Sequence, residues 1–193
     1  SGLAILQAQA DQLVQRVAVI DWDVHHGNGP QQAFYDSADV LTLSIHQEML
    51  YPVNLGTIGE QGENAGHGHN INIPLPAGSG GGAYLAALDD VVLPALHAFK
   101  PDLIVIACGY DACYFDPLSH MLLVANHFRT MTQKIMQAAD ELCGGKVVAN
   151  HEGGYSDPYA GTEFVANQNL YPHQQAAINQ VINGPLQTLL QRY

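Results

Sequence analysis

Apolar runs of strand length recur along the chain and are separated by longer, mixed stretches. The runs are Val17–Ile20, Val40–Ile45, Ile71–Ile73, Leu103–Cys108 and Val147–Ala149. Several of them are apolar throughout instead of alternating with polar residues, as expected for parallel strands that are covered on both faces. The pattern therefore predicts a set of buried strands in a mostly parallel sheet.

Helix-like stretches lie between and around these runs. They are Leu3–Val14, Ala83–Phe99, Leu118–Leu142, which Gly144 and Gly145 should end, and the tail His173–Arg192, which Gly184 and Pro185 should interrupt. Asn54–His69 is rich in Gly, Asn and His and is predicted to be a loop. Strands that alternate with helices predict an α/β fold with right-handed crossovers. We find no internal repeat and no linker, which favours one domain or a large part of one.

Composition narrows the classes of partner. Eighteen acidic residues against six basic ones give a formal net charge of -12, which argues against binding a nucleic-acid backbone. We see no apolar run that is long enough to span a membrane, and no signal peptide at the start. Three cysteines without a CxxC pair are expected to be reduced thiols, so the chain is expected to be cytoplasmic.

Three of the predicted strands run into polar or charged residues, which are costly to bury without partners. The segments that follow them are Asp21–Gly29, which reads DWDVHHGNG, Gly109–Asp111, which reads GYD, and His151–Tyr155, which reads HEGGY. In open α/β sheets, ligands bind beyond the carboxyl ends of the strands. The chain therefore offers metal-binding and proton-handling groups to one edge of the sheet.

Asp23, His25 and Asp111 form the candidate metal set. Asp23 and His25 are two residues apart, so in an extended segment their side chains point to the same side. Three protein ligands with an open fourth position are typical of catalytic zinc. The plain alternative is that the aspartates cap the next helix while the histidines form hydrogen bonds in the core. We favour the metal because groups from three strand ends converge.

Tyr155 follows Gly153 and Gly154, which permit tight backbone geometry and close approach of a ligand. A phenol at this place is suited to donate to a developing oxyanion. A tyrosine at an ordinary turn would give the same pattern.

Gly78–Ala83 reads GSGGGA and imitates a dinucleotide-binding turn, with Asp102 at roughly the expected ~20 residues further on. The plain interpretation is a flexible helix entry, and a nucleotide-binding α/β protein is kept as a rival function. Cys108 is expected in the core, and Cys113 has no partner at a spacing typical of redox motifs.

Together these motifs resemble the zinc-dependent histone deacetylase superfamily, which includes acetylpolyamine amidohydrolases and bacterial histone deacetylase-like amidohydrolases. The matching stretches are DWDVHHGNG at Asp21–Gly29, LSIH at Leu43–His46, GYDA at Gly109–Ala112 with DPL at Asp116–Leu118, and HEGGY at His151–Tyr155. The DPL and HEGGY forms resemble the class II and acetylpolyamine branch. The resemblance implies a three-layer α/β/α fold with a mostly parallel sheet, as in arginases and deacetylases.

The resemblance also implies roles for individual residues. Asp23, His25 and Asp111 resemble the ligands of one zinc ion, whereas the arginases use two manganese ions and further aspartates. Tyr155 resembles the catalytic tyrosine that polarises the acetyl carbonyl. The residues that resemble the acyl-lysine tunnel are Tyr51, Leu118, Gly153 and Gly154. Those that resemble a structural monovalent-cation site, usually potassium, are Asp21, Ser44 and Ile45 through its carbonyl.

The implied reaction is hydrolysis of an acetylated amine, either acetyl-lysine or an acetylpolyamine, to the amine and acetate. The family also has a tandem histidine pair well upstream of the DVHHG motif, which is not among these residues. His25 and His26 are not that pair, because His25 is assigned to zinc. We therefore expect residues 1–193 to be one partial deacetylase domain that alone has weak or no activity. The alternative is a non-catalytic acyl-lysine-binding, metal-binding or degenerate module.

The resemblance places the missing N-terminal strands beyond Val147–Ala149. That strand is then expected to be an edge of the sheet, with unpaired backbone groups. Because such edges invite pairing with another chain, self-association through this edge is expected.

Overall fold

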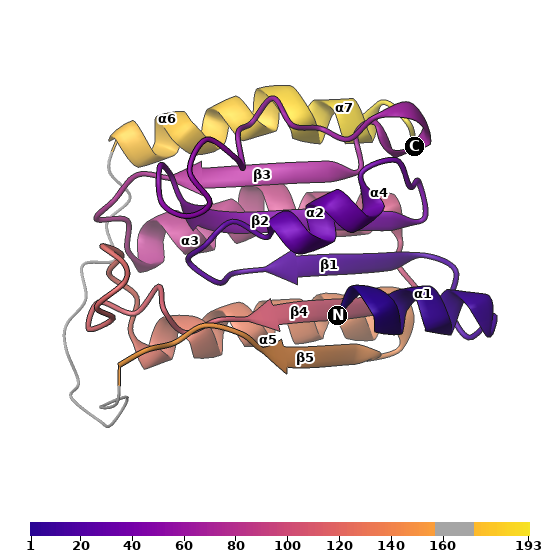
Figure 1. The fold of residues 1–193 in the computed structure, drawn as a ribbon, viewed down its shortest axis with the longest axis horizontal. Coiled ribbons are helices and arrows are strands. Elements are labelled where there is room, and N and C mark those ends of the chain that lie inside the picture. Colours follow the sequence, from indigo (N-terminus) through magenta and orange to yellow (C-terminus); the bar gives the residue numbers. More distant parts are fainter. Residues whose placement is uncertain (157–171) are drawn as a thin grey trace.

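A computed structural model describes residues 1–156 and 172–193. Among these residues, five strands form one parallel sheet in the order β3-β2-β1-β4-β5 (Figure 1). The strands are β1 (Val17–Asp21), β2 (Val40–Gln47), β3 (Asn70–Leu75), β4 (Leu103–Cys108) and β5 (Val147–His151). Each apolar run in the sequence that was predicted to be a strand is one.

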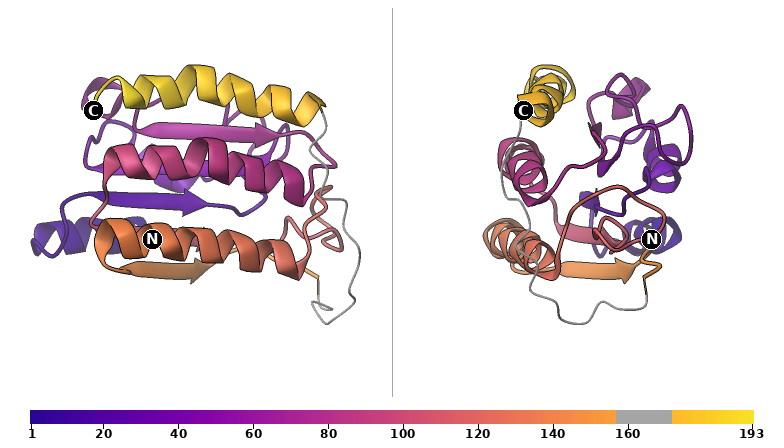
Figure 2. Two further views of the ribbon diagram at one scale, coloured as in Figure 1. Left: turned by 180° about the vertical axis from the view of Figure 1, so that it is seen from behind. Right: turned by 90° about the vertical axis from the view of Figure 1, so that its left-hand side faces the viewer.

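Helices cover both faces of the sheet (Figure 2). One face carries α3 (Gly81–Ala87), α4 (Leu93–Phe99), α5 (Ala125–Cys143), α6 (Pro172–Val181) and α7 (Gln187–Leu190). The other face carries α1 (Gly2–Ala10) and α2 (Asn28–Phe34). The short helices are η1 (Asn64–Gly66), η2 (Leu88–Val92) and η3 (Ile182–Leu186). The predicted three-layer α/β/α fold is confirmed.

The core explains why the strands are apolar throughout. Every residue of β1 and β2 is buried, because these strands lie inside the sheet and are covered on both faces. The larger apolar cluster joins the inner strands to the helices of the α3–α5 face, with Tyr84 and Leu96 fully buried. A smaller cluster around Ile5 and Phe34 lies beneath α1 and α2.

The strand order places a topological switch point between β1 and β4. From β1 the chain moves outward to β2 and β3, whereas β4 and β5 extend the sheet on the other side of β1. The carboxyl ends of β1 and β4 are therefore neighbours, with Asp21 in register with Ala107. In open α/β sheets this is the place where ligands bind.

Two predicted helix boundaries are wrong. The first helix ends at Ala10 instead of Val14, because Gln12 adopts a positive φ of 59°, which a right-handed helix cannot contain. The long helix begins at Ala125 instead of Leu118. Before it, Leu122 and Leu123 form isolated β-bridges, and their backbone groups are thus used outside a helix.

The predicted interruption of the last helix lies at the expected residues. Gly184 and Pro185 lie in the π-helical segment η3, which replaces α-helical geometry between α6 and α7 while the chain stays helical. Proline lacks an N–H and collides with the preceding turn of an α-helix. The extra residue in the π-helical turn accommodates Pro185, which is buried.

The continuous helix Gly81–Phe99 is, by length and composition, apolar enough to cross a membrane, so the prediction that no apolar run has the required length is wrong. Half of this apolar segment is buried inside the protein. A helix that packs in a protein core has the same length and composition. Gly81, its first residue, has a packing role, because a Cβ atom there would collide with the ring of His127 on α5. This contact accounts for one glycine of the GSGGGA stretch.

The strand β5 is one of the two edges of the sheet in the described part of the chain, opposite β3 (Figure 1). Its residues are largely exposed, unlike those of the other strands, and Val148 keeps 52% of its surface accessible. The expected edge is therefore present. Cys108, Cys113 and Cys143 are buried free thiols, and the expected cytoplasmic location stays a prediction.

Candidate metal centre and active site

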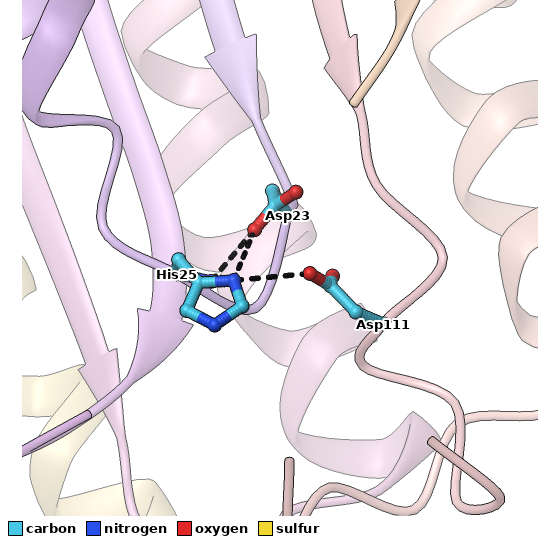
Figure 3. A group of neighbouring side chains, drawn as sticks. All are labelled: Asp23, His25 and Asp111. Carbon is cyan, nitrogen blue, oxygen red and sulfur yellow. Dashed lines mark hydrogen bonds and ion pairs between the residues drawn. The ribbon is translucent and has the colours of Figure 1, made fainter. Parts of the chain in front are cut away.

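Three side chains converge where β1 and β4 end (Figure 3). His25 Nδ1 lies 2.9 Å from Asp23 Oδ1 and 3.0 Å from Asp111 Oδ2. One potential ligand atom from each of the three residues lies within 4.8 Å of the others. The structure thus brings together the three residues that were predicted to form the metal set. They come from two loops, and His25 and Asp111 are 86 residues apart in sequence.

Backbone amides orient the two carboxylates. The Val24 N–H donates to Asp111 Oδ1 at 2.8 Å, and the Gly153 N–H donates to Asp23 Oδ2 at 2.7 Å. The His25 N–H donates to Asp23 Oδ1 at 2.8 Å. Hydrogen bonds of this kind fix the orientation of metal-ligating groups. The segments after β1, β4 and β5 therefore all contribute to the centre.

Two glycines make room for these carboxylates. A Cβ atom on Gly109 would lie 2.5 Å from Asp23 Oδ2 and 2.6 Å from its Cα. A Cβ atom on Gly153 would lie 2.5 Å from Asp23 Oδ2 and would overlap Asp111 Oδ2. Only glycine fits at either position. Gly154, by contrast, has a φ of 135°, a conformation that other residues rarely adopt.

The charges of the centre favour a bound cation. The hydrogen bonds that His25 Nδ1 makes with the carboxylates of Asp111 and then Asp23 raise the pKa of His25 to about 10. Asp111 is fully buried, and this burial raises the pKa of its carboxyl. Two carboxylates and one imidazole thus stabilise positive charge between them. A divalent ion would provide that charge in place of the imidazole proton, and two aspartates with one neutral histidine would balance it.

Two tyrosine rings flank His25. The rings of Tyr51 and Tyr155 have centroids 6.4 Å from that of His25, and both are nearly perpendicular to it. Tyr51 is 70% exposed and Tyr155 is 55% exposed, so both are accessible to a ligand. Partial burial and the charges of Asp111 and Asp23 raise the pKa of the Tyr155 phenol, which therefore keeps its proton.

One further residue connects parts of the site. The buried carboxylate of Asp116 accepts the N–H of Leu118 at 2.9 Å through Oδ1 and the N–H of Tyr155 at 2.7 Å through Oδ2. Sequence reasoning noted the DPL motif but gave Asp116 no role. The signal was weak, because its partners are backbone amides, one of them 39 residues away.

A family model described as the histone deacetylase domain matches residues 1–169. The chain belongs to the histone deacetylase family. Its similarity to curated members is high: it is 48% identical over 158 residues to the histone deacetylase-like amidohydrolase of Pseudomonas aeruginosa. That match covers 82% of this chain and 42% of the relative. The chain is also 40% identical to the probable deacetylase of Archaeoglobus fulgidus, with 79% of this chain and 43% of the relative covered.

Solved structures of histone deacetylases have the same fold. The histone deacetylase Clr3 superposes with a TM-score of 0.80 and 34% identity over 93% of this chain and 33% of that chain. The HDA15 HD domain superposes with a TM-score of 0.82 and 31% identity over 97% of this chain and 55% of that one. The chain spans less than half the length of the two curated relatives.

The residues expected to hold a monovalent cation in this deacetylase-family chain lie side by side. Asp21 and Ser44 are register partners on β1 and β2, and Ile45 follows Ser44 in the same strand. The Ser44 hydroxyl accepts the Gly27 N–H at 3.1 Å, and Asp21 Oδ1 accepts the Asp23 N–H at 3.0 Å. Asp21 is buried, with 7% of its surface exposed, and lies beside the candidate metal centre. Potassium at this place stays a prediction.

Proposed function

We propose that the protein containing these residues is a zinc-dependent amidohydrolase that converts an acetylated amine to the amine and acetate. The observation that carries the proposal is the cluster of Asp23, His25 and Asp111 at the switch point, with one ligand atom from each within 4.8 Å. Family membership supports the reaction class, because relatives are named deacetylases and amidohydrolases.

The donor set suits zinc, the metal on which this family generally depends. Two carboxylate oxygens and an imidazole nitrogen are common zinc ligands, and three of them leave a position for substrate or water. When bound, the ion would polarise the amide carbonyl and lower the pKa of a water molecule. In the same proposal, Asp21, Ser44 and the Ile45 carbonyl hold a structural potassium ion.

Tyr155 would stabilise the transition state. Its phenol lies beside His25 and is protonated at neutral pH, as tyrosine ordinarily is, and burial and the neighbouring aspartates raise its pKa further. A neutral phenol can donate a hydrogen bond to an oxygen that becomes negative during attack on the amide. Gly153 and Gly154 leave the space in which the acetyl group would approach.

The substrate would be a cationic acylamine, namely acetyl-lysine or an acetylpolyamine. Tyr51 and Leu118 are exposed and would flank the path of its alkyl chain. The net charge of -12 suits a cationic amine. Residues 1–193 contain no histidine before His25, so the general base expected from the upstream pair is not among them. Loss of a positioned acid or base costs on the order of 10² to 10⁴ in rate, so these residues alone should be nearly inactive.

Metal analysis of the purified chain tests the centre. Wild type should contain one zinc ion, and Asp23→Ala should lose it because one ligand and its charge are removed. Asp90→Ala is the matched control, since Asp90 is an exposed aspartate in η2 outside the candidate metal cluster, and it should keep its zinc. Wild type that binds no zinc would overturn the proposed metal centre.

The reaction is tested by deacetylation of an acetyl-lysine peptide and of an acetylpolyamine by the complete protein that contains residues 1–193, called the full chain below. Turnover of either substrate, abolished by Asp111→Ala, is the expected result. A full chain that binds zinc and acetyl-lysine without turnover would favour the alternative, a non-catalytic binding module. A rate from residues 1–193 equal to that of the full chain would contradict the need for an upstream base.

A further inference from the structure

Asp116 is a buried carboxylate beside the site that the proposed mechanism does not use. Only 5% of the residue is exposed, and each of its two oxygens accepts one backbone N–H. One N–H belongs to Leu118, expected along the substrate path, and the other to Tyr155, expected to act on the substrate. A single side chain therefore contacts the backbone of two functional residues.

The loop that carries Asp116 is held firmly against the core. The Asp116 N–H donates to the Cys113 carbonyl at 2.9 Å, and Cys113 forms a β-bridge with Leu123, which is fully buried. The Tyr110 N–H, at the start of this loop, donates to the Gly153 carbonyl at 2.8 Å. The carboxylate thus has a fixed position from which it can hold the less buried Tyr155 segment.

We propose that Asp116 is a positioning residue that places the Tyr155 phenol and the Leu118 side chain relative to the Asp23–His25–Asp111 centre. The proposal rests on the proposed deacetylase function and assigns Asp116 no contact with substrate or metal. Hydrogen bonds from two amides to one carboxylate are charge-assisted and stronger than those to a neutral acceptor. An aspartate at the junction of the two segments therefore couples the phenol to the substrate path.

Replacing Asp116 with asparagine is the most selective test, because asparagine keeps the shape of the side chain. Its amide group offers one oxygen, and its NH₂ must face the second backbone N–H, so one of the two hydrogen bonds is lost. Asp102→Asn is the matched control. Asp102 Oδ2 also accepts two backbone N–H groups, from Gln15 at 3.0 Å and Arg16 at 2.8 Å, but at the amino end of β4.

The first measurement needs no activity. Amide hydrogen exchange of the full chain should be faster at Tyr155 or Leu118 in Asp116→Asn and unchanged there in Asp102→Asn. Binding of Co²⁺, followed by its visible absorption, should be the same in both variants and wild type, because the metal ligands are intact. Unchanged exchange at both amides would overturn the proposal.

The second measurement is a double-mutant cycle on turnover of an acetyl-lysine peptide. Displacement of the phenol should lower kcat of Asp116→Asn by about 100-fold, as misplacement of about 1 Å can do. Added to Tyr155→Phe, Asp116→Asn should lower kcat no further, since it acts through the same phenol. Any rise in KM should persist in the Tyr155→Phe background, because it arises through Leu118. Additive losses in kcat would assign Asp116 a general structural role and overturn the proposal.

Two outcomes separate this inference from the proposed function. A wild-type full chain without turnover overturns both, whereas normal turnover with an unaffected Asp116→Asn overturns this inference alone. If Asp116→Asn fails to fold, Asp116→Ser, which retains one acceptor oxygen, takes its place in both measurements. Loss of folding in both variants would show that Asp116 acts on stability and would overturn the positioning role.

Discussion

At the scale of single residues, the candidate centre requires glycine beside its two carboxylates as strictly as it requires the carboxylates themselves. Gly153 donates its N–H to Asp23 Oδ2, and any Cβ atom on it would overlap Asp111 Oδ2. We predict that Gly153→Ala displaces a carboxylate and weakens zinc binding by about 10- to 100-fold, the usual effect of disturbing groups behind the ligands. Competition with a chromogenic zinc chelator measures the affinity.

Gly29→Ala is the control for that prediction. Gly29 lies in α2, and a Cβ atom there would meet no atom within 4 Å, so its zinc affinity should equal that of wild type. Equal affinities for Gly153→Ala and wild type would show that the centre can relax around a methyl group, contrary to the packing described here.

Sequence patterns predicted Asp23, His25 and Asp111 because each follows an apolar strand, and parallel strands end at one edge. They could not predict the hydrogen bonds of Asp116, whose partners are backbone amides. A backbone N–H has no sequence signature, and which two amides meet a carboxylate depends on the path of two loops. The resemblance supplied Tyr155, which GGY alone would leave as a turn tyrosine.

At the scale of elements, the start of α5 shows how a side chain sets a helix boundary. The His127 ring accepts the Val124 N–H through Nδ1 at 3.2 Å, and the His127 N–H donates to the Val124 carbonyl at 2.8 Å. This reciprocal pair resembles a capping box, which ordinarily has Glu or Gln at the third position. Because histidine is not an expected capping residue, the sequence carries no clear signal for this boundary, and the prediction of a start at Leu118 was wrong.

His127 should make stability depend on pH. The residue is 2% exposed, and burial lowers its pKa below the ordinary value. Below about pH 6.5 the unfolded chain binds a proton that the folded chain does not, so the free energy of unfolding falls as pH decreases. The contribution is complete above that pH and is lost between the unfolded pKa and the lower folded one.

The test is His127→Gln, whose oxygen can accept the Val124 N–H without titrating. Urea unfolding with a chelator present should show that wild type loses more stability between pH 8 and pH 5 than the variant. The variant keeps part of the dependence, because burial also lowers the pKa of His26, His46 and His69. Parallel stability curves for the two proteins would contradict the role of His127.

At the scale of the whole molecule, the apolar runs predicted five strands but not their order. The order β3-β2-β1-β4-β5 depends on which face of the sheet each connection crosses. It is set by contacts between strands that are far apart in sequence. That order creates the switch point, and the switch point brings Asp111 to Asp23 and His25. The candidate residues were therefore predictable from residue types, whereas the reason why they meet lies in the topology.

The same order leaves β5 as an edge in the part of the chain that the structure describes. Its residues are largely exposed, and a strand edge carries unpaired N–H and C=O groups that can pair with a second copy. We predict that residues 1–193 alone self-associate through β5. Sedimentation velocity and light scattering should show species larger than a monomer that increase with protein concentration.

Charge on this edge should oppose that pairing. Val148→Lys puts a cation on an exposed position of β5 and should shift the distribution toward monomer, since natural sheets use edge lysines to prevent pairing. Leu3→Lys, on an exposed position of α1, is the matched control and should leave the distribution as in wild type, because α1 offers no unpaired strand. A monodisperse wild-type monomer at all concentrations would contradict the prediction. Equal effects of the two variants would instead indicate that overall charge, and not the edge, governs association.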